Sequence, residues 1–242
     1  MTKDSITNKF IVLVTVHNSK QWIGKCLDSV ISQTYKNYRL VVIDDFSDDG
    51  TWEIIQKYNC FKHRNDQQYF HSLISMISAI PVFSEDPEDV IISLDGDDWL
   101  SDDSVLEYLN SVYSSDVWLT YGQYEPLSRT YSSPCKPIDA RTYRKSGEWR
   151  VSHLKTFRRK LWDRIDQRDF LDKNGFYLLT CGDLAMMYPM IEMAGDKHIR
   201  LAERVLMIYN DSNPMSHTRI MPETSLRIAA YLQSKPCYDA ID

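Results

Sequence analysis

Three continuous runs of apolar residues, at positions 10–16, 40–43 and 90–94, constrain the fold of this chain more than any other sequence feature. The runs are rich in Val and Ile and do not alternate with polar residues, which is typical of strands buried on both faces of a parallel sheet. Between the first two runs, apolar side chains recur at helical spacing from Trp22 to Ile31. A strand, a helix and a strand in this order form a βαβ unit, so the runs predict an α/β protein with a mostly parallel central sheet flanked by helices.

The same pattern continues to residue 122, after which the chain becomes more irregular. We expect further helices at 51–58, 73–80, 105–112, 159–165, 183–193 and 223–234, and further strands at 117–121, 151–157 and 204–208. Turn residues concentrate between Tyr124 and Pro137, which marks a boundary inside one compact domain. The two expected halves are residues 1–122 and 123–242.

Composition excludes several classes of protein. Of the 242 residues, 43% are hydrophobic and 26% are charged, which disfavours intrinsic disorder, and the net charge of −6 gives no general attraction to nucleic acid. The apolar run Phe10–Val16 is far shorter than the ~20 residues that span a bilayer, and the first residues lack the apolar stretch of a signal peptide. We therefore expect a cytoplasmic protein with no transmembrane segment and no nucleic-acid partner, and the sequence leaves its oligomeric state open.

Some chemically distinctive side chains are expected to be structural. The five cysteines have no CxxC spacing, which favours free thiols over a zinc site: Cys26, Cys60, Cys135, Cys181 and Cys237. Four methionines have the spacing of a packed helix face: Met186, Met187, Met190 and Met193. A basic stretch contains His153, Lys155, Arg158 and Arg159; it could face phosphates or an acceptor, and its arginines are expected on a solvated face.

Polar residues follow the apolar runs at three places where a parallel strand would end. They are Thr15 and His17 after the first run, Asp44 and Asp45 after the second, and an acidic turn that begins at Asp95 after the third. In an open α/β sheet, ligands bind outside the carboxyl ends of the strands. The sequence therefore predicts one binding site to which all three strand ends contribute.

The acidic turn Asp95-Gly96-Asp97-Asp98 suggests a divalent metal site. Several carboxylates on one tight turn repel each other strongly unless a cation or hydrogen-bond donors lie among them. Mg²⁺ and Mn²⁺ prefer oxygen ligands and bind through a few carboxylates together with substrate phosphates. The alternative is structural, with these aspartates capping the helix that follows.

The earlier acidic segment is better explained by ligand binding than by calcium. Asp45, Ser47, Asp49 and Gly50 have the spacing of an EF-hand loop, but Gln56 stands where that loop needs a bidentate carboxylate. We expect Asp45 to accept hydrogen bonds from a nucleobase or a ribose, while the residues after it form a turn and cap the next helix.

Taken in order, the segments Val12–Asn18, Val42–Thr51 and Leu94–Asp98 resemble those of the family 2 glycosyltransferases, which have the GT-A fold. The resemblance is strongest over residues 9–120 and implies a nucleotide-sugar donor, with a UDP-sugar favoured, and a glycan or another hydroxyl compound as acceptor. It implies the following site residues: Thr15 and His17 beside the nucleotide, Asp45 at the base or ribose, and Asp95, Gly96 and Asp97 at the sugar diphosphate, where Asp95 and Asp97 hold Mn²⁺ or Mg²⁺. Asp98 would be an additional ligand. Thr15 and His17 stand where the family usually has Pro and an aromatic residue.

The resemblance also places a catalytic base and a further metal ligand in the second half. Asp183 matches the acidic residue that begins a helix in the family, although Gly182 replaces the acid that often precedes it. It would deprotonate the acceptor hydroxyl and invert the configuration of the sugar; its structural alternative is a helix cap. His217 lies where some relatives have a histidine near the metal, and its alternative is an ordinary exposed histidine.

Residues 1–122 would then bind the nucleotide sugar, and residues 123–242 would bind the acceptor and supply the base. Two other functions remain open from the sequence. A sugar nucleotidyltransferase has a similar metal-binding nucleotide domain, although this chain lacks a Gly-rich phosphate loop after its first strand. A non-catalytic module that binds nucleotide sugars or carbohydrates is the other.

Overall fold

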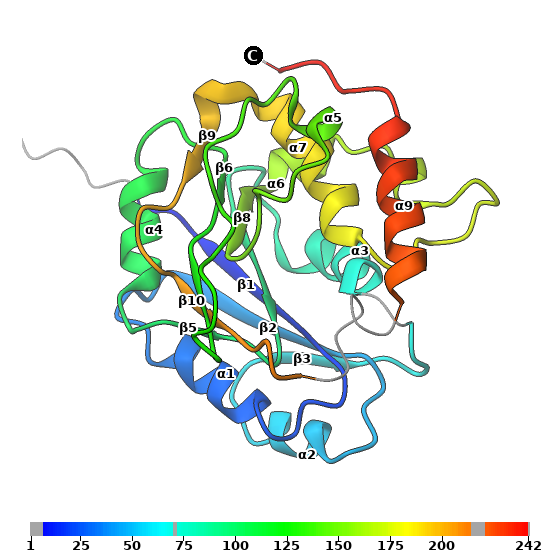
Figure 1. Cartoon of the computed structure of the whole chain (residues 1–242). Helices are drawn as coiled ribbons and strands as arrows, with labels where there is room; N and C mark the ends of the chain where they lie inside the picture. The colour runs from blue at the N-terminus through cyan, green and yellow to red at the C-terminus, as the bar shows by residue number, and fades with distance from the viewer. Residues whose placement is uncertain (1–6, 70–71, 214–220, 242) are drawn as a thin grey trace, which may run out of the picture.

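Seven strands form the central sheet of the structure, a computed structural model that describes residues 7–69, 72–213 and 221–241 (Figure 1). Across the sheet they are β3 (Phe61–Arg64), β2 (Tyr38–Asp44), β1 (Phe10–Val16), β4 (Val90–Asp95), β8 (Lys155–Arg158), β6 (Leu119–Tyr121) and β9 (Ile199–Leu201). The strand β8 is antiparallel to both of its neighbours, and the other pairs are parallel. The expected α/β class with a mixed, mostly parallel sheet is confirmed.

A small second sheet and a set of helices complete the fold. The second sheet has the order β5 (Trp99–Leu100), β10 (Met207–Tyr209) and β7 (Tyr124–Pro126). The helices are α1 (Ile23–Ile31), α2 (Thr51–Ile55), α3 (Ser72–Phe83), α4 (Val105–Tyr113), α5 (Tyr143–Ser146), α6 (Arg159–Trp162), α7 (Gly182–His198) and α9 (Pro222–Ser234), with a 3₁₀ turn at Gln167–Phe170. None of the helices in these described ranges is long and apolar enough to cross a membrane.

The strand β1 has two buried faces because a hydrophobic core lies on each side of the sheet. Phe10, Val12 and Val14 pack into a core that includes α1 and α4, whereas Ile11 and Leu13 pack into one that includes α3 and α7. Figure 1 shows α1 on one side of the sheet and α3 and α7 on the other. Successive side chains of a strand point to opposite faces, so only a continuous apolar run can satisfy both cores.

Several expectations differ from the structure. The strands β3, β5 and β7 were not expected, and the strand expected at 151–157 is β8 at Lys155–Arg158. The edge strand β3 has side chains that are partly or fully exposed, so it lacks an apolar signature. The strand β9 directly follows α7, and the strand expected at 204–208 is β10, a few residues later. Arg158 is not on a solvated face: it is buried, and its guanidinium donates hydrogen bonds to three backbone carbonyls, those of Val117, Glu88 and Tyr113.

The methionines of α7 are buried as expected, and a buried ion pair anchors this helix to the surrounding segments. Arg144 of α5 donates from Nε and Nη2 to the two carboxylate oxygens of Glu192, at 2.7 and 2.6 Å. The exposed fractions of the two side chains are 2% and 3%. The backbone N–H of Tyr238 donates to the same carboxylate, so this pair connects α7, α5 and the segment after α9.

Removing one member of this pair is expected to be costly. Arg144→Met leaves the Glu192 carboxylate buried without its cation, and the free energy of unfolding should fall by about 3–5 kcal/mol. Urea unfolding followed by circular dichroism measures the change. The double variant Arg144→Met/Glu192→Met should lose less than the single variant, because it leaves no uncompensated charge; an equal or larger loss would assign the effect to packing.

Candidate active site

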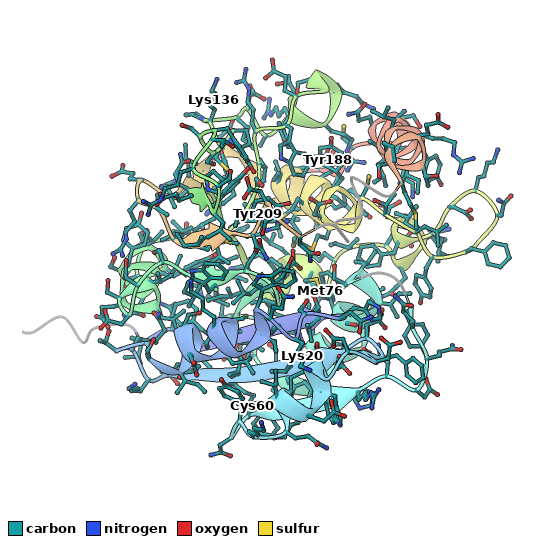
Figure 2. All side chains as sticks on the ribbon, turned by 60° about the horizontal axis from the view of Figure 1, so that its bottom comes forward. Lys20, Cys60, Met76, Lys136, Tyr188 and Tyr209 are labelled. Atoms are coloured by element: carbon teal, nitrogen blue, oxygen red, sulfur yellow. The ribbon has the colours of Figure 1, made fainter. Side chains whose placement is uncertain are left out.

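A pocket of about 490 Å³ opens at the carboxyl ends of β1, β2 and β4. Seven of the residues that the sequence nominates contribute to its lining: Thr15, His17, Asp45, Asp95, Gly96, Asp97 and Asp183. Asp98, the expected additional ligand, is buried next to the lining residue Asp97, and His217 lies outside the described residues. Figure 2 labels two further lining residues, Met76 on α3 and Tyr209 on β10, near the middle of the molecule.

Strand register brings the first group of side chains together. Thr15 of β1 pairs with Ile43 of β2 on one side and with Asp95 of β4 on the other, so the three strands end side by side. The ring of His17 hydrogen-bonds through Nδ1 to the carbonyl oxygen of Asp45, at 2.8 Å. This contact ties the loop after β1 to the loop after β2 at one end of the pocket.

The two aspartates at the end of β2 differ in role. Asp44 is fully buried, accepts hydrogen bonds from Ser47 and lies 3.3 Å from Nε of Arg64, which makes it part of the loop structure. Asp45 lines the pocket, and its Oδ1 accepts hydrogen bonds from the Asn65 side chain and the Tyr69 backbone N–H, at 2.8 and 2.9 Å. These donors orient the Asp45 carboxylate at the pocket wall.

The acidic turn packs so closely on β1 that its second residue has no room for a side chain. A Cβ atom added to Gly96 would lie 2.5 Å from Cβ of Val16. The Gly96 N–H donates to the Thr15 carbonyl at 2.9 Å, which fixes the turn against the strand end. Asp97, on the same turn, accepts a hydrogen bond from Nδ2 of Asn213 at 2.7 Å. The acidic turn is therefore held between β1 and the loop after β10.

Burial and mutual repulsion disfavour the charged forms of the acidic turn. Burial, followed by the charge of Asp97, raises the pKa of Asp95 to about 6 although the Lys155 ammonium lowers it. Burial and the charges of Asp97 and Asp95 hold the pKa of Asp98 well above its ordinary value. The protein alone therefore compensates only part of the negative charge of the acidic turn.

The residues present fit a divalent metal ion. Asp95, Asp98 and His153 each offer a ligand atom, and these atoms lie within 4.8 Å of one another. The Oδ2 atom of Asp98 is buried and has no hydrogen-bond partner in the described part of the chain. Burial and the nearby Lys155 charge lower the pKa of His153 well below its ordinary value, which keeps the imidazole neutral, the form that binds metals. Two carboxylates and an imidazole are ligands that Mn²⁺ accepts.

Asp183 lies across the pocket in the first turn of α7. The helix begins at Gly182, after Cys181 in a left-handed conformation with φ of 59°. The carboxylate of Asp183 accepts a hydrogen bond from the N–H of Leu184 at Oδ1, 2.9 Å away, and Nζ of Lys155 lies 3.6 Å from Oδ2. A carboxylate in a helical first turn is stabilised by the helix dipole, so Asp183 combines a structural position with access to the pocket.

Three residues in or next to the pocket are only weakly indicated by the sequence. Asp98 is expected only as an additional ligand, and His153 and Lys155 only as members of a basic stretch. The available signal was a charged residue inside the strand expected at 151–157, and in the structure Lys155 begins β8 and is 3% exposed. A buried lysine is uncommon unless it is paired, which points to a partner in the site.

The fold and the pocket define an α/β protein that binds its ligand at the carboxyl ends of the sheet strands. The family model "Glycosyl transferase family 2" matches residues 11–181, which is more than half of the chain, and the chain therefore belongs to this family. Among curated proteins, glycosyltransferase GlyA of Streptococcus pneumoniae serotype 4 is 30% identical over 121 residues. That match covers 49% of this chain and 17% of GlyA, so the chain aligns with only a small part of this relative.

Solved structures show the same fold. The structure of S. aureus TarS 1–349 in complex with UDP has a TM-score of 0.66 at 17% identity and covers 93% of this chain and 65% of that chain. The mannosyltransferase PcManGT from Pyrobaculum calidifontis, in complex with GDP-Man and Mn²⁺, has a TM-score of 0.64 at 16% identity, with coverage of 97% and 68%. At these identities the likeness establishes the GT-A fold that the sequence predicts.

The raised pKa of Asp95 predicts a gain in stability when its charge is removed. The pKa rises from 3.8 in the unfolded chain to about 6, so the folded protein binds this proton more tightly and the free energy of unfolding falls as the pH rises through this range. Asp95→Asn should therefore raise the free energy of unfolding of the metal-free protein at neutral pH, by at most about 3 kcal/mol.

Urea unfolding in EDTA between about pH 4 and pH 7 tests this expectation, because the difference between the two proteins should grow with pH. Asp102→Asn is the matched control, for which we expect the opposite change in the free energy of unfolding. Although burial alone would raise its pKa, hydrogen bonds from Ser104 and Arg204 lower the pKa of Asp102, so its replacement should destabilise the fold at neutral pH. An Asp95→Asn variant less stable than the parent at neutral pH would contradict the electrostatic account.

Proposed function

We propose that this chain transfers a sugar from a nucleoside diphosphate sugar, with a UDP-sugar as the favoured donor, to a hydroxyl group of a glycan or another acceptor. The observation that carries the proposal is the convergence of Asp45, the acidic turn at Asp95 and the facing Asp183 on one pocket. Family membership supports the reaction class, and the neighbours TarS, solved with UDP, and PcManGT, solved with GDP-Man and Mn²⁺, support the donor class.

The donor would lie along the strand ends. Thr15 and His17 would flank the nucleotide, and Asp45 would accept hydrogen bonds from the base or the ribose. Residues 1–122 would thus bind the donor, and residues 123–242 would shape the acceptor side and supply the base. His153, Lys155 and Asp183 line the same pocket from the second half, so the reaction would take place between the two halves.

A divalent metal, Mn²⁺ or Mg²⁺, would be held by Asp95 and Asp97, with Asp98 and His153 as the further ligands that the geometry favours. His217 remains a proposed ligand. When bound, such an ion offsets the negative charge that grows on the departing diphosphate. The chain itself orients these ligands: Thr15 donates a hydrogen bond to Asp95, Asn213 holds Asp97, and the Asn210 N–H donates to Asp98 at 2.7 Å.

Asp183 would act as the general base. Its carboxylate would take the proton of the acceptor hydroxyl as that oxygen attacks the anomeric carbon from the face opposite the diphosphate, which inverts the configuration. A general base that accepts this proton commonly contributes a factor of about 10² to 10⁴ to the rate.

Binding of the donor should stabilise the fold in a metal-dependent way. At a concentration of about 100 Kd, a ligand selective for the native state adds about 2.7 kcal/mol, equivalent to a rise in Tm of about 5–10 °C for a chain of this size. We expect this rise with a UDP-sugar and Mn²⁺ in a thermal-shift screen of UDP-, GDP-, dTDP- and CDP-sugars, and a much smaller one in EDTA or in Asp95→Asn. Asp103→Asn, on an exposed site outside the pocket, should behave like the parent.

Two outcomes of that screen and its follow-up would contradict sugar transfer. Pyrophosphate release from a nucleoside triphosphate and a sugar 1-phosphate would indicate nucleotidyl transfer. Tight donor binding without turnover across a broad acceptor panel, and without donor hydrolysis, would indicate a binding module.

Replacing the proposed base should separate binding from turnover. Asp183→Asn keeps the shape of the side chain and an oxygen for the Leu184 N–H, but it cannot take a proton. We expect kcat to fall at least about 100-fold while the Kd for UDP changes less than about threefold, as measured by donor consumption and by calorimetry. Glu223→Gln is the control, because it removes an acid from the first turn of α9 without touching the pocket. Equal losses of affinity and rate would contradict the base assignment.

A further inference from the structure

Lys155 is a buried cation in a pocket whose lining also includes four carboxylates. Its residue is 3% exposed, it begins β8, and it lines the pocket with Asp95, Asp97 and Asp183. Desolvating an ammonium group is costly unless an opposite charge compensates for it. Its one ion pair among the described residues is with Asp183, whose Oδ2 lies 3.6 Å from Nζ. A lysine in this position therefore needs an explanation beyond packing.

Strand register explains how Lys155 reaches both sides of the pocket. Ser93 of β4 pairs with Lys155 of β8, and Asp95 lies two residues further along β4. Residues two apart on a strand share a face, so Lys155 is on the same face of the sheet as Asp95. From this position its charge lowers the pKa of Asp95, while its ammonium group contacts the carboxylate of Asp183.

The two oxygens of Asp183 are held from two directions. Oδ1 accepts a hydrogen bond from the backbone N–H of Leu184, and Oδ2 faces the Lys155 ammonium. The first contact comes from the helix itself, and the second comes from a strand of the central sheet. Two fixed contacts define both the position and the rotation of a carboxylate, whereas the helix contact alone would leave the group free to turn toward solvent, since 29% of the Asp183 side chain is exposed.

We infer that Lys155 is a positioning residue for the proposed base: its ammonium group, fixed on β8, holds the Asp183 carboxylate toward the site where the acceptor hydroxyl would be deprotonated. This inference rests on the proposed function, because it assigns Lys155 a role that acts through Asp183. A contrasting role would be direct binding of the donor diphosphate, and the two roles differ in which kinetic quantity depends on Lys155.

The test compares Lys155→Met, Lys155→Arg and Asp183→Asn with the parent protein. Turnover is measured as UDP release from UDP-GlcNAc with Mn²⁺, and nucleotide affinity is measured by calorimetry with UDP. If Lys155 positions Asp183, Lys155→Met should lower kcat about 10- to 100-fold and leave the Kd for UDP within about twofold of the parent value. Lys155→Arg, which keeps the cation, should recover a large part of the lost turnover. Thermal melting checks that each variant is folded.

The outcomes separate this inference from the proposed function. Full activity of Asp183→Asn would contradict the proposed role of Asp183 as the general base. An inactive Asp183→Asn together with an unchanged Lys155→Met would overturn only the role of Lys155. A rise in the Kd for UDP in Lys155→Met, with kcat retained, would also overturn it and would assign Lys155 to the diphosphate.

Crystal structures of the parent and of Lys155→Met give a readout that does not depend on turnover. We expect the Asp183 carboxylate to face Nζ of Lys155 in the parent, and to rotate away from the pocket or occupy more than one conformation in the variant. An unchanged, singly ordered Asp183 carboxylate in Lys155→Met would show that the helix contact alone holds it, and the inference would be wrong.

Discussion

The in-register pairing of β1 with β2 and β4 is the constraint on which the rest of the site depends. Because Thr15 pairs with both Ile43 and Asp95, three separate strand ends arrive at one edge of the sheet. The strands are held there by cores on both faces, so the polar residues that follow them have little freedom to move apart. The absent side chain of Gly96 shows how tight this edge is, since its turn lies directly on Val16.

Because the strand ends lie side by side, several carboxylates are close to one another and repel each other. A cation from the second half of the chain compensates for part of this negative charge. The first half contributes Asp45, Asp95 and Asp97 to the pocket lining, and the buried Asp98 lies next to them. The antiparallel strand β8 then enters the sheet beside β4 and brings Lys155 to the same region. One ammonium group offsets only part of this charge, as the raised pKa of Asp95 shows. A pocket with this residual imbalance is suited to a ligand that includes a divalent cation.

Much of the fold could be predicted because its central strands have a strong local signal. The continuous apolar run at Phe10–Val16 indicates a strand that is buried on both faces. The polar residues that follow it indicate where the strand ends at the pocket. The strand β3 gave no such signal because it lies at the sheet edge, where exposed side chains need no apolar pattern. The burial of Arg158 was unpredictable for a related reason: the carbonyls that accept its hydrogen bonds come from segments far away in the chain.

The site residues also divide into those with a local sequence signal and those placed by contacts between distant segments. Asp45, Asp95 and Asp183 stand out in the sequence because each lies at the end of a strand or the start of a helix, where local patterns are informative. His153 and Lys155 belong to the site only because β8 pairs with β4 in the opposite direction and in a particular register. Shifting that register by one residue would turn Lys155 to the other face of the sheet, into a hydrophobic core. The position of Asp183 therefore depends on the pairing of a strand far from it in sequence, as well as on the helix that carries it.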